Sequence, residues 1–291
     1  MNPKSSGTVA NYLSLIKFSH TVFALPFALI GFLLGLKYNG FDFSTALAIK
    51  VLLCMVFARN AAMAFNRWTD RNIDAANPRT INREIPSGII SEKSALIFAI
   101  INALLFIATT FFINKLCFLL SPIALLVVLG YSYTKRFTAL CHLVLGVGLS
   151  LAPIGAFLAV TGKFEWEPLL YSFAVLFWVS GFDIIYSLQD DAFDRMNQLK
   201  SLPSVLGRKN ALILSRFFHV LTLLFLLAAI NHKSFGNWGY IGLLLFSMLL
   251  IYQHFLVKED DLSKVNIAFF TTNGIASVVF ALCLTAGMFI R

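Results

Sequence analysis

Nine stretches of this 291-residue chain are apolar over the roughly 20 residues that a helix needs to cross a lipid bilayer. Apolar residues make up 58% of the sequence and charged residues only 13%, against about 25% charged in ordinary soluble domains. Because lipid leaves no partner for an open backbone, runs of this length are expected to be helices. The predicted spans are residues 18–38, 45–65, 94–113, 116–134, 138–161, 168–188, 210–230, 238–257 and 266–290. The sequence therefore predicts an all-α integral membrane protein, with residues 1–291 in one transmembrane domain.

The basic residues predict how the spans are oriented. Lys and Arg gather at the N-terminus and in the connections after the second, fourth, sixth and eighth spans. By the positive-inside rule, this predicts a cytoplasmic N-terminus and a C-terminus outside. The first residues lack a cleavable signal pattern, so the first span is expected to be retained. The net charge of +9 is therefore attributed to membrane topology, and no nucleic-acid partner is expected.

Two acidic clusters follow apolar spans on the predicted cytoplasmic side. Asn66, Asp70 and Asp74 are spaced by four residues, which places their side chains on one face of a helix at about 100° per residue. A second cluster has spacings of three to four residues. Its members are Asp183, Tyr186, Asp190 and Asp194. The two predicted cytoplasmic loops, about residues 66–93 and 189–209, are longer than a helical bundle requires, and such loops are usually functional or disordered.

The two clusters are interpreted as Mg²⁺ ligands, because Mg²⁺ is usually bound by one or two carboxylates together with substrate phosphates. The alternative is a solvated loop whose acids pair with neighbouring arginines. Two clusters at span ends on one side favour the metal. Arg59 and Asp183 lie inside spans, where an ionised side chain costs about 3 kcal/mol and usually has a function. Arg59 shares a helix face with Asn66 and Asp70, and Asp183 with Asp190 and Asp194, at spacings of seven and eleven residues.

Basic and aromatic residues end the fourth span on the same side. Tyr131 and Lys135 are four residues apart and Arg136 follows, and such cations suit phosphate or carboxylate oxygens. An aromatic and basic anchor at the membrane interface is the alternative. His20 and His142 are interpreted as packed or interfacial residues. A basic rim could be completed by Lys17, Arg79, Arg83 and Lys200.

In combination, these motifs resemble the UbiA-type membrane prenyltransferases, a family typified by 4-hydroxybenzoate polyprenyltransferase. The resemblance covers nearly the whole chain and implies nine transmembrane helices around a central cavity. The matching segments are Asn66-xxx-Asp70-xxx-Asp74, then Asn77-Pro78-Arg79-Thr80 with Arg83 and Pro86-Ser87-Gly88, then Tyr131-xxx-Lys135 with Arg136, and Asp183 to Asp194 followed by Lys200-Ser201.

The resemblance implies a transferase of alkyl groups other than methyl. It would move a polyprenyl group from a polyprenyl diphosphate to the ring of an aromatic acid similar to 4-hydroxybenzoate, release diphosphate, and require Mg²⁺. The reaction would serve respiratory quinone biosynthesis. The expected location is the bacterial inner membrane, with the active site facing the cytoplasm and the lipid tail leaving between helices. No obligate protein partner is expected.

The resemblance also implies roles for individual residues. The implied metal ligands are Asn66, Asp70, Asp74, Asp190 and Asp194. The implied catalytic residues are Asp183, Arg136, Tyr131 and Lys135. The implied substrate-binding residues are Lys17, Arg59, Asn66, Arg79, Arg83, Tyr186 and Lys200.

Three segments look more like the subgroup associated with menaquinone made by the futalosine route. They are Lys17 to Thr21, Arg83 to Pro86, and Gly181 to Tyr186. A naphthoate acceptor is therefore the alternative for the same chemistry. An alternative from a different class is a cation-coupled transporter. Such a protein would place its charges near the bilayer midplane in opposed half-helices, whereas the charges of this sequence gather at one face of the membrane. Phosphatidyltransferases are another class of membrane enzyme with aspartates and a divalent metal, but their dense aspartate run does not occur in this sequence.

Overall fold

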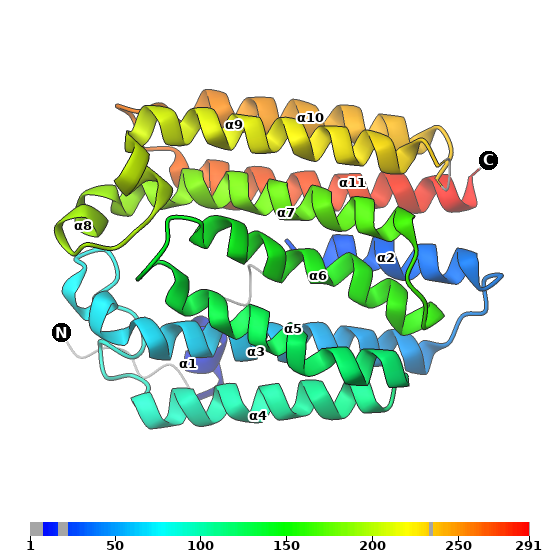
Figure 1. Cartoon of the computed structure of the whole chain (residues 1–291), viewed down its shortest axis with the longest axis horizontal. Coiled ribbons are helices and arrows are strands. Elements are labelled where there is room, and N and C mark those ends of the chain that lie inside the picture. The colour runs from blue at the N-terminus through cyan, green and yellow to red at the C-terminus, as the bar shows by residue number, and fades with distance from the viewer. Residues whose placement is uncertain (1–7, 17–22, 233–234, 291) are drawn as a thin grey trace.

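In the computed structural model, which describes residues 8–16, 23–232 and 235–290, the regular secondary structure is helical. The longest helices run side by side along the long axis of the molecule (Figure 1). The helices are α1 (Thr8–Leu15), α2 (Leu25–Tyr38), α3 (Thr45–Ala76), α4 (Glu92–Phe111), α5 (Lys115–Thr134), α6 (Cys141–Thr161), α7 (Trp166–Ser187), the 3₁₀-helix η2 (Leu188–Asp190), α8 (Asp191–Met196), α9 (Leu202–Ile230), α10 (Trp238–Leu256), the π-helix η3 (Ile267–Thr272) and α11 (Asn273–Phe289).

The predicted class, an all-α membrane protein, is confirmed. Over the described ranges, eight helical segments are long and apolar enough to cross a membrane, and α2 is a shorter apolar helix. The beginning of the first predicted span, residues 18–22, lies outside the described residues. The count of nine spans therefore stays a prediction.

Side-chain caps set the beginnings of four long helices. In each case an oxygen of the capping side chain accepts the backbone N–H three residues further on, which satisfies a donor that the first helical turn leaves open. The capping residues are Ser44 before α3, Ser91 before α4, Asn114 before α5 and Ser201 before α9. The predicted spans for α3, α4 and α5 begin within two residues of the observed helices.

Both predicted cytoplasmic loops are partly helical. Helix α3 continues to Ala76 rather than ending near residue 65, and α9 begins at Leu202 rather than near 210. A search for apolar runs misses the extension of α3 because most of its side chains are polar, and it misses the start of α9 because Pro203, Gly207 and two charged residues interrupt its apolar residues. Gly207 has a left-handed φ of 79° and separates the first turn of α9 from its long apolar part. The first acidic cluster therefore lies on a helix, as its spacing predicted, although the segment from residue 66 was also predicted to be a loop.

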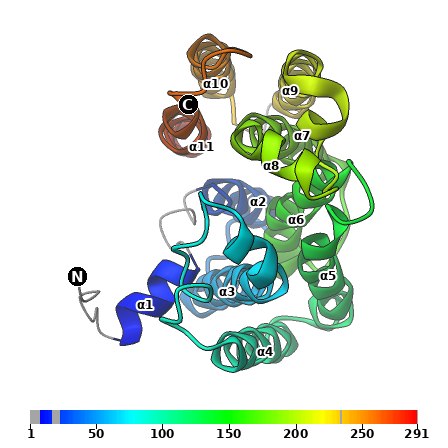
Figure 2. The ribbon, with the colours of Figure 1, turned by 90° about the vertical axis from the view of Figure 1, so that its left-hand side faces the viewer.

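The packing of the helices places α7 across the bundle from α3. Helix α7 packs against α6 and α9, and α6 packs against α2. Seen end-on, the pairs α3–α4 and α10–α11 lie on opposite sides of the bundle (Figure 2). Aromatic rings join α2, α7 and α10, with the ring centroid of Trp178 5.3 Å from that of Phe27 and 5.7 Å from that of Phe246. This core fixes α7, which carries Asp183 and Tyr186 of the second acidic cluster.

Candidate active site

A cavity of about 280 Å³ lies where α3, α5, α6 and α7 meet the connections that follow α3 and α7. We call it the charged cavity. It brings together segments that are 111 residues apart in the sequence. Its lining includes most of the predicted site residues, namely Arg59, Asn66, Asp70, Asp74, Arg79, Arg83, Tyr131, Lys135, Asp183, Tyr186, Asp190 and Asp194.

Asp70 connects the first acidic cluster to the basic end of α5. Its carboxylate is buried, with Oδ2 2.9 Å from Lys135 Nζ and Oδ1 3.2 Å from Arg136 Nη2. Asn66, one turn earlier on α3, donates its amide N–H to Oδ2 at 3.3 Å. Arg136 also donates to the carbonyl of Thr69 at 2.7 Å, and it is not part of the cavity lining. Arg136 therefore acts on the cavity through Asp70.

Asp74, one turn further along α3, is 3% exposed and lies between two arginines. Its Oδ1 accepts a hydrogen bond from Arg83 at 2.7 Å, and its Oδ2 lies 4.0 Å from Nη1 of Arg67. Oδ2 is buried and accepts no hydrogen bond from the described residues. A buried carboxylate with one unused oxygen can accept a further cation.

Asp190 connects the second acidic cluster to the segment after α3. Arg79 donates from Nε to Oδ1 at 2.8 Å and from Nη2 to Oδ2, and Asn77 donates to Oδ1 at 2.9 Å. Nη1 of Arg79 donates to the hydroxyl of Tyr186 at 3.1 Å. Burial lowers the pKa of Arg79, but the hydrogen bonds and the charge of Asp190 raise it more, so the pKa is raised overall. Arg79 therefore remains a cation.

Asp183 lies in the charged cavity on α7, two turns before Asp190. Its Oδ2 is 2.7 Å from Nδ1 of His142, a buried residue at the start of α6. Tyr131 of α5 and Arg59 of α3 line the same cavity. This part of the site thus combines a carboxylate, a phenol and a guanidinium, groups that can recognise an aromatic acid through its hydroxyl and its carboxylate.

Some predicted residues lie elsewhere, and some cavity residues were not predicted. Lys17 lies outside the described residues. The exposed Lys200 does not line the cavity, but its backbone N–H donates to the carbonyl of Lys135 at 2.7 Å. Arg67, Asn77 and His142 were not among the predicted site residues. For Arg67, the seven-residue spacing to Asp74 on one helix is a signal that could have indicated the contact.

The acidic side chains fit a hard cation that is shared with a substrate. Five carboxylates and the amide of Asn66 line the charged cavity. Across the part of the chain that the structure describes, no three acidic, His or Cys side chains form a closed metal site, and Asp70, Asp74 and Asp190 are paired with basic residues. Mg²⁺ is usually bound by one or two carboxylates plus substrate phosphates and water, so this donor set suits it.

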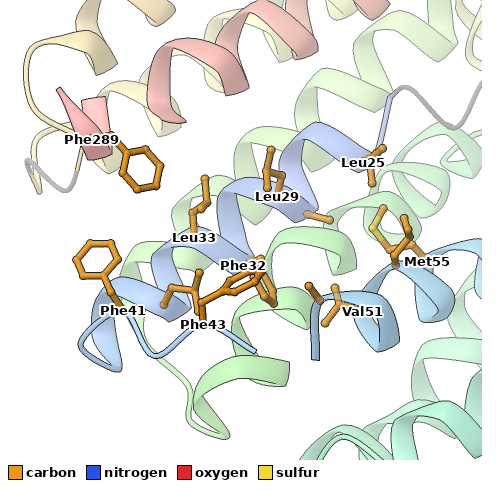
Figure 3. A pocket seen from close by; sticks show the side chains of 13 residues that line it. Leu25, Leu29, Phe32, Leu33, Phe41, Phe43, Val51, Met55 and Phe289 are labelled. Carbon is orange, nitrogen blue, oxygen red and sulfur yellow. The ribbon is translucent and has the colours of Figure 1, made fainter. Parts of the chain in front are cut away.

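A second hollow, of about 520 Å³, lies between α2 and α3 (Figure 3). We call it the apolar groove. Val51 and Met55 of α3 face Leu29 and Phe32 of α2 across it. Along α3, the lining changes from Arg59 in the charged cavity to Met55 in the apolar groove within about one helical turn. The groove therefore lies next to the cavity and offers apolar surface.

A membrane bundle with a charged cavity at one end and an apolar groove beside it is suited to substrates with a charged head and an apolar tail.

Residues 24–275 match the UbiA prenyltransferase family, and the chain belongs to this family. It is 33% identical to a 4-hydroxybenzoate octaprenyltransferase of Nitrosomonas eutropha over 231 residues, which cover 79% of this chain and 80% of the relative. A relative of the same name from Aliivibrio salmonicida is 31% identical over 80% of this chain and 81% of its own length.

Solved structures agree with the fold. The apo structure of a UbiA homologue from Aeropyrum pernix matches with a TM-score of 0.78 and 30% identity, covering 93% of this chain and 97% of that one. A UbiA homologue from Archaeoglobus fulgidus bound to DMAPP and Mg²⁺ matches with a TM-score of 0.74 and 22% identity, covering 97% of this chain and all of the other. The predicted family and the predicted enzyme class, an aromatic prenyltransferase, are confirmed.

We predict that Asp74→Asn destabilises the metal-free protein by about 3 kcal/mol, because it removes a buried carboxylate that pairs with Arg83 and faces Arg67, which is 6% exposed. The measurement is the free energy of unfolding of the detergent-solubilised protein in chelator. Glu92→Gln is the matched control, since the ion pair of Glu92 with Arg71 is more exposed and is expected to contribute less than about 1 kcal/mol. Equal losses in the two variants would contradict the prediction.

Proposed function

We propose that this protein transfers a polyprenyl group from a polyprenyl diphosphate to the ring of an aromatic acid similar to 4-hydroxybenzoate, as a step of respiratory quinone biosynthesis. The observation that carries the proposal is one cavity in which carboxylates and cations stand beside Asp183, Tyr131 and Arg59, with the apolar groove adjoining. The names of the relatives, 4-hydroxybenzoate octaprenyltransferase, support the same activity.

The charged cavity would bind the diphosphate together with Mg²⁺. When bound, the ion would neutralise the charge that grows on the diphosphate as it leaves. Its ligands would come from Asn66, Asp70, Asp74, Asp190 and Asp194. Lys135, Arg79 and Arg83 already contact these carboxylates, so their cationic groups are within reach of phosphate oxygens that enter the cavity. Arg136 belongs with this group, because it contacts Asp70.

Breaking the allylic C–O bond sends the electron pair to the diphosphate and leaves a carbocation-like carbon. Phe182, Phe269 and Tyr186 line the cavity, with ring centroids of Phe269 5.2 Å from Phe182 and 4.2 Å from Tyr186. Aromatic rings can stabilise a nearby cation, and their apolar surface would exclude the water that would capture it.

At the acceptor end, Arg59 would hold the ring carboxylate and Asp183 would accept the hydrogen bond of the ring hydroxyl, with Tyr131 between α3 and α7. This raises the electron density of the ring carbon that forms the new C–C bond. Loss of the proton from that carbon to the released diphosphate, a base that the reaction itself supplies, then restores aromaticity. A naphthoate of the futalosine route carries the same carboxylate and remains the alternative acceptor.

We propose that the protein acts in the bacterial inner membrane, with residues 1–291 forming one transmembrane domain. The N-terminus and the charged cavity would face the cytoplasm and the C-terminus the outside. The support is the distribution of Lys and Arg along the chain. Lys17 would contribute to the basic rim on the cytoplasmic side, and so would Lys200.

We predict that Asp70→Asn and Asp190→Asn each abolish prenyl transfer, because each removes a carboxylate proposed to hold Mg²⁺. The measurement is transfer of a labelled prenyl group in membranes with Mg²⁺ and, separately, with chelator, which is also expected to stop the reaction. Asp261→Asn, a change of an exposed acid between α10 and η3, is the control and should be fully active. Normal turnover in either variant, or in chelator, would count against the metal site.

Acceptor choice is tested by offering 4-hydroxybenzoate and a futalosine-route naphthoate separately, with one polyprenyl diphosphate as donor. We expect a higher kcat/KM for 4-hydroxybenzoate, in keeping with the names of the relatives. Preference for the naphthoate would establish the alternative acceptor. Failure with both acceptors, in membranes that contain folded protein, would refute the proposed function.

We further predict that the apolar groove receives the prenyl tail. Val51→Trp should narrow the groove and lower kcat/KM for an octaprenyl donor at least about tenfold, while a geranyl donor is used normally because its tail is short. The measurement is a competition between the two donors. Ile97→Trp, on the exposed face of α4, is the matched control. An equal effect on both donors would argue against this path for the tail.

A further inference from the structure

His142 is a buried residue whose two ring nitrogens both have hydrogen-bond partners. It is the second residue of α6, and it is 2% exposed. Nδ1 lies 2.7 Å from Oδ2 of Asp183, and Nε2 lies 3.2 Å from the backbone nitrogen of Leu202, the first residue of α9. The imidazole thus bridges a carboxylate of the charged cavity and the beginning of a helix that follows the second acidic cluster.

The partners of His142 determine where its proton lies. The backbone N–H of Leu202 can only donate, so Nε2 must accept. The ring proton is then on Nδ1, which donates to the carboxylate of Asp183. This hydrogen bond occupies Oδ2 and leaves Oδ1 to meet a ligand in the cavity. Asp183 is thereby kept as a hydrogen-bond acceptor with a fixed orientation.

The surroundings of His142 hold the ring in this position. Its carbonyl accepts a hydrogen bond from the hydroxyl of Ser180 on α7 at 3.2 Å. The neighbouring Cys141 thiol donates to the carbonyl of Lys200 at 3.5 Å. Helices α6 and α7 approach closely at Gly146, where a Cβ atom would collide with the backbone of Leu176. The start of α6 is therefore tied to both α7 and the start of α9.

Another buried histidine, which lies away from the charged cavity, offers a comparison. His219 of α9 contacts His254 of α10 at 2.8 Å and the carbonyl of Trp178 at 3.3 Å, and neither histidine lines the charged cavity. His142 differs because it lines that cavity and its Nδ1 partner is Asp183. Packing between helices alone does not require a donor aimed at this carboxylate.

We propose that His142 is a positioning residue for Asp183. Its Nδ1–H holds the carboxylate in the orientation that receives the hydroxyl of the aromatic acceptor, and the Leu202 N–H keeps the proton on Nδ1. The inference rests on the proposed function, in which Asp183 meets the acceptor. Hydrogen bonds to an ionised group are shorter and stronger than neutral ones, so this contact is suited to fixing a carboxylate inside a cavity.

The test compares His142→Asn with His142→Gln. The amide nitrogen of Asn can occupy the place of Nδ1 and still donate to Asp183, whereas the longer Gln places its amide near Nε2, beside Leu202. We expect the Asn variant to retain most of the wild-type activity. The Gln variant should lose about 10- to 100-fold in kcat/KM for the acceptor. Binding of Mg²⁺ with inorganic pyrophosphate should be unchanged in both, because that site lies at the other carboxylates.

Three outcomes would overturn the proposal. These are equal activity of the Asn and Gln variants, a parallel loss of acceptor and pyrophosphate binding, and an unchanged kcat/KM in a folded Gln variant. Folding is followed by the thermal midpoint and the size-exclusion profile. If the Gln variant does not fold, Leu202→Pro provides a second test. It removes the N–H that fixes the proton on Nδ1, together with the buried Leu202 side chain, at the first position of a helix, where proline is tolerated.

Leu202→Pro is expected to weaken acceptor binding and to leave pyrophosphate binding unchanged, and an unaltered acceptor affinity would refute the proposal. The failure of this inference is distinguishable from the failure of the proposed function. If the wild-type protein transfers prenyl groups and none of the variants affects the acceptor, only the role of His142 is refuted. If the wild-type protein transfers nothing to either acceptor, the proposed function itself fails.

Discussion

The ion pair between Arg79 and Asp190 joins two segments that are 111 residues apart and closes one side of the charged cavity. Asp70 and Asp74 are paired in the same manner with Lys135 and Arg83. In a protein surrounded by lipid, carboxylates this well buried would be too costly without such partners. The pairing therefore makes it possible for an acid-rich site to exist at the end of a membrane bundle before any substrate arrives. It also means that a phosphate group meets cations whose side chains are already ordered, so less conformational entropy is lost on binding.

Much of this arrangement could be predicted from the sequence. The apolar runs located the long helices, because the thickness of a bilayer sets the length of a span. The spacing of four between Asn66, Asp70 and Asp74 predicted a common face, and these residues do line one cavity. The same approach failed for residues 66–76 and for the start of α9 at Leu202, which are helical although neither segment is a continuous apolar run. The length of apolar sequence needed to cross a bilayer says nothing about the part of a helix that extends beyond the lipid.

The pairing of individual charges could not be predicted. Both an ion-pair network and a metal site were compatible with the acidic clusters, and the structure shows carboxylates bound to basic residues around a cavity that a substrate can enter. The partner of His142 was equally hidden. It lies 41 residues away on another helix, and a single histidine in an apolar segment has no spacing that indicates its contact. Such pairs depend on how the helices pack, which local patterns do not determine.

Helix α3 is continuous and carries residues of both the charged cavity and the apolar groove. At about 1.5 Å per residue, Asp74 near one end and Val51 near the other are separated by roughly 35 Å, comparable to the thickness of the lipid core. A molecule that binds along α3 would have its head and its tail positioned by residues of the same helix. Changes in the groove can therefore alter which tail is accepted without moving the groups at the head, so that length selection and bond chemistry can evolve separately on a single helix.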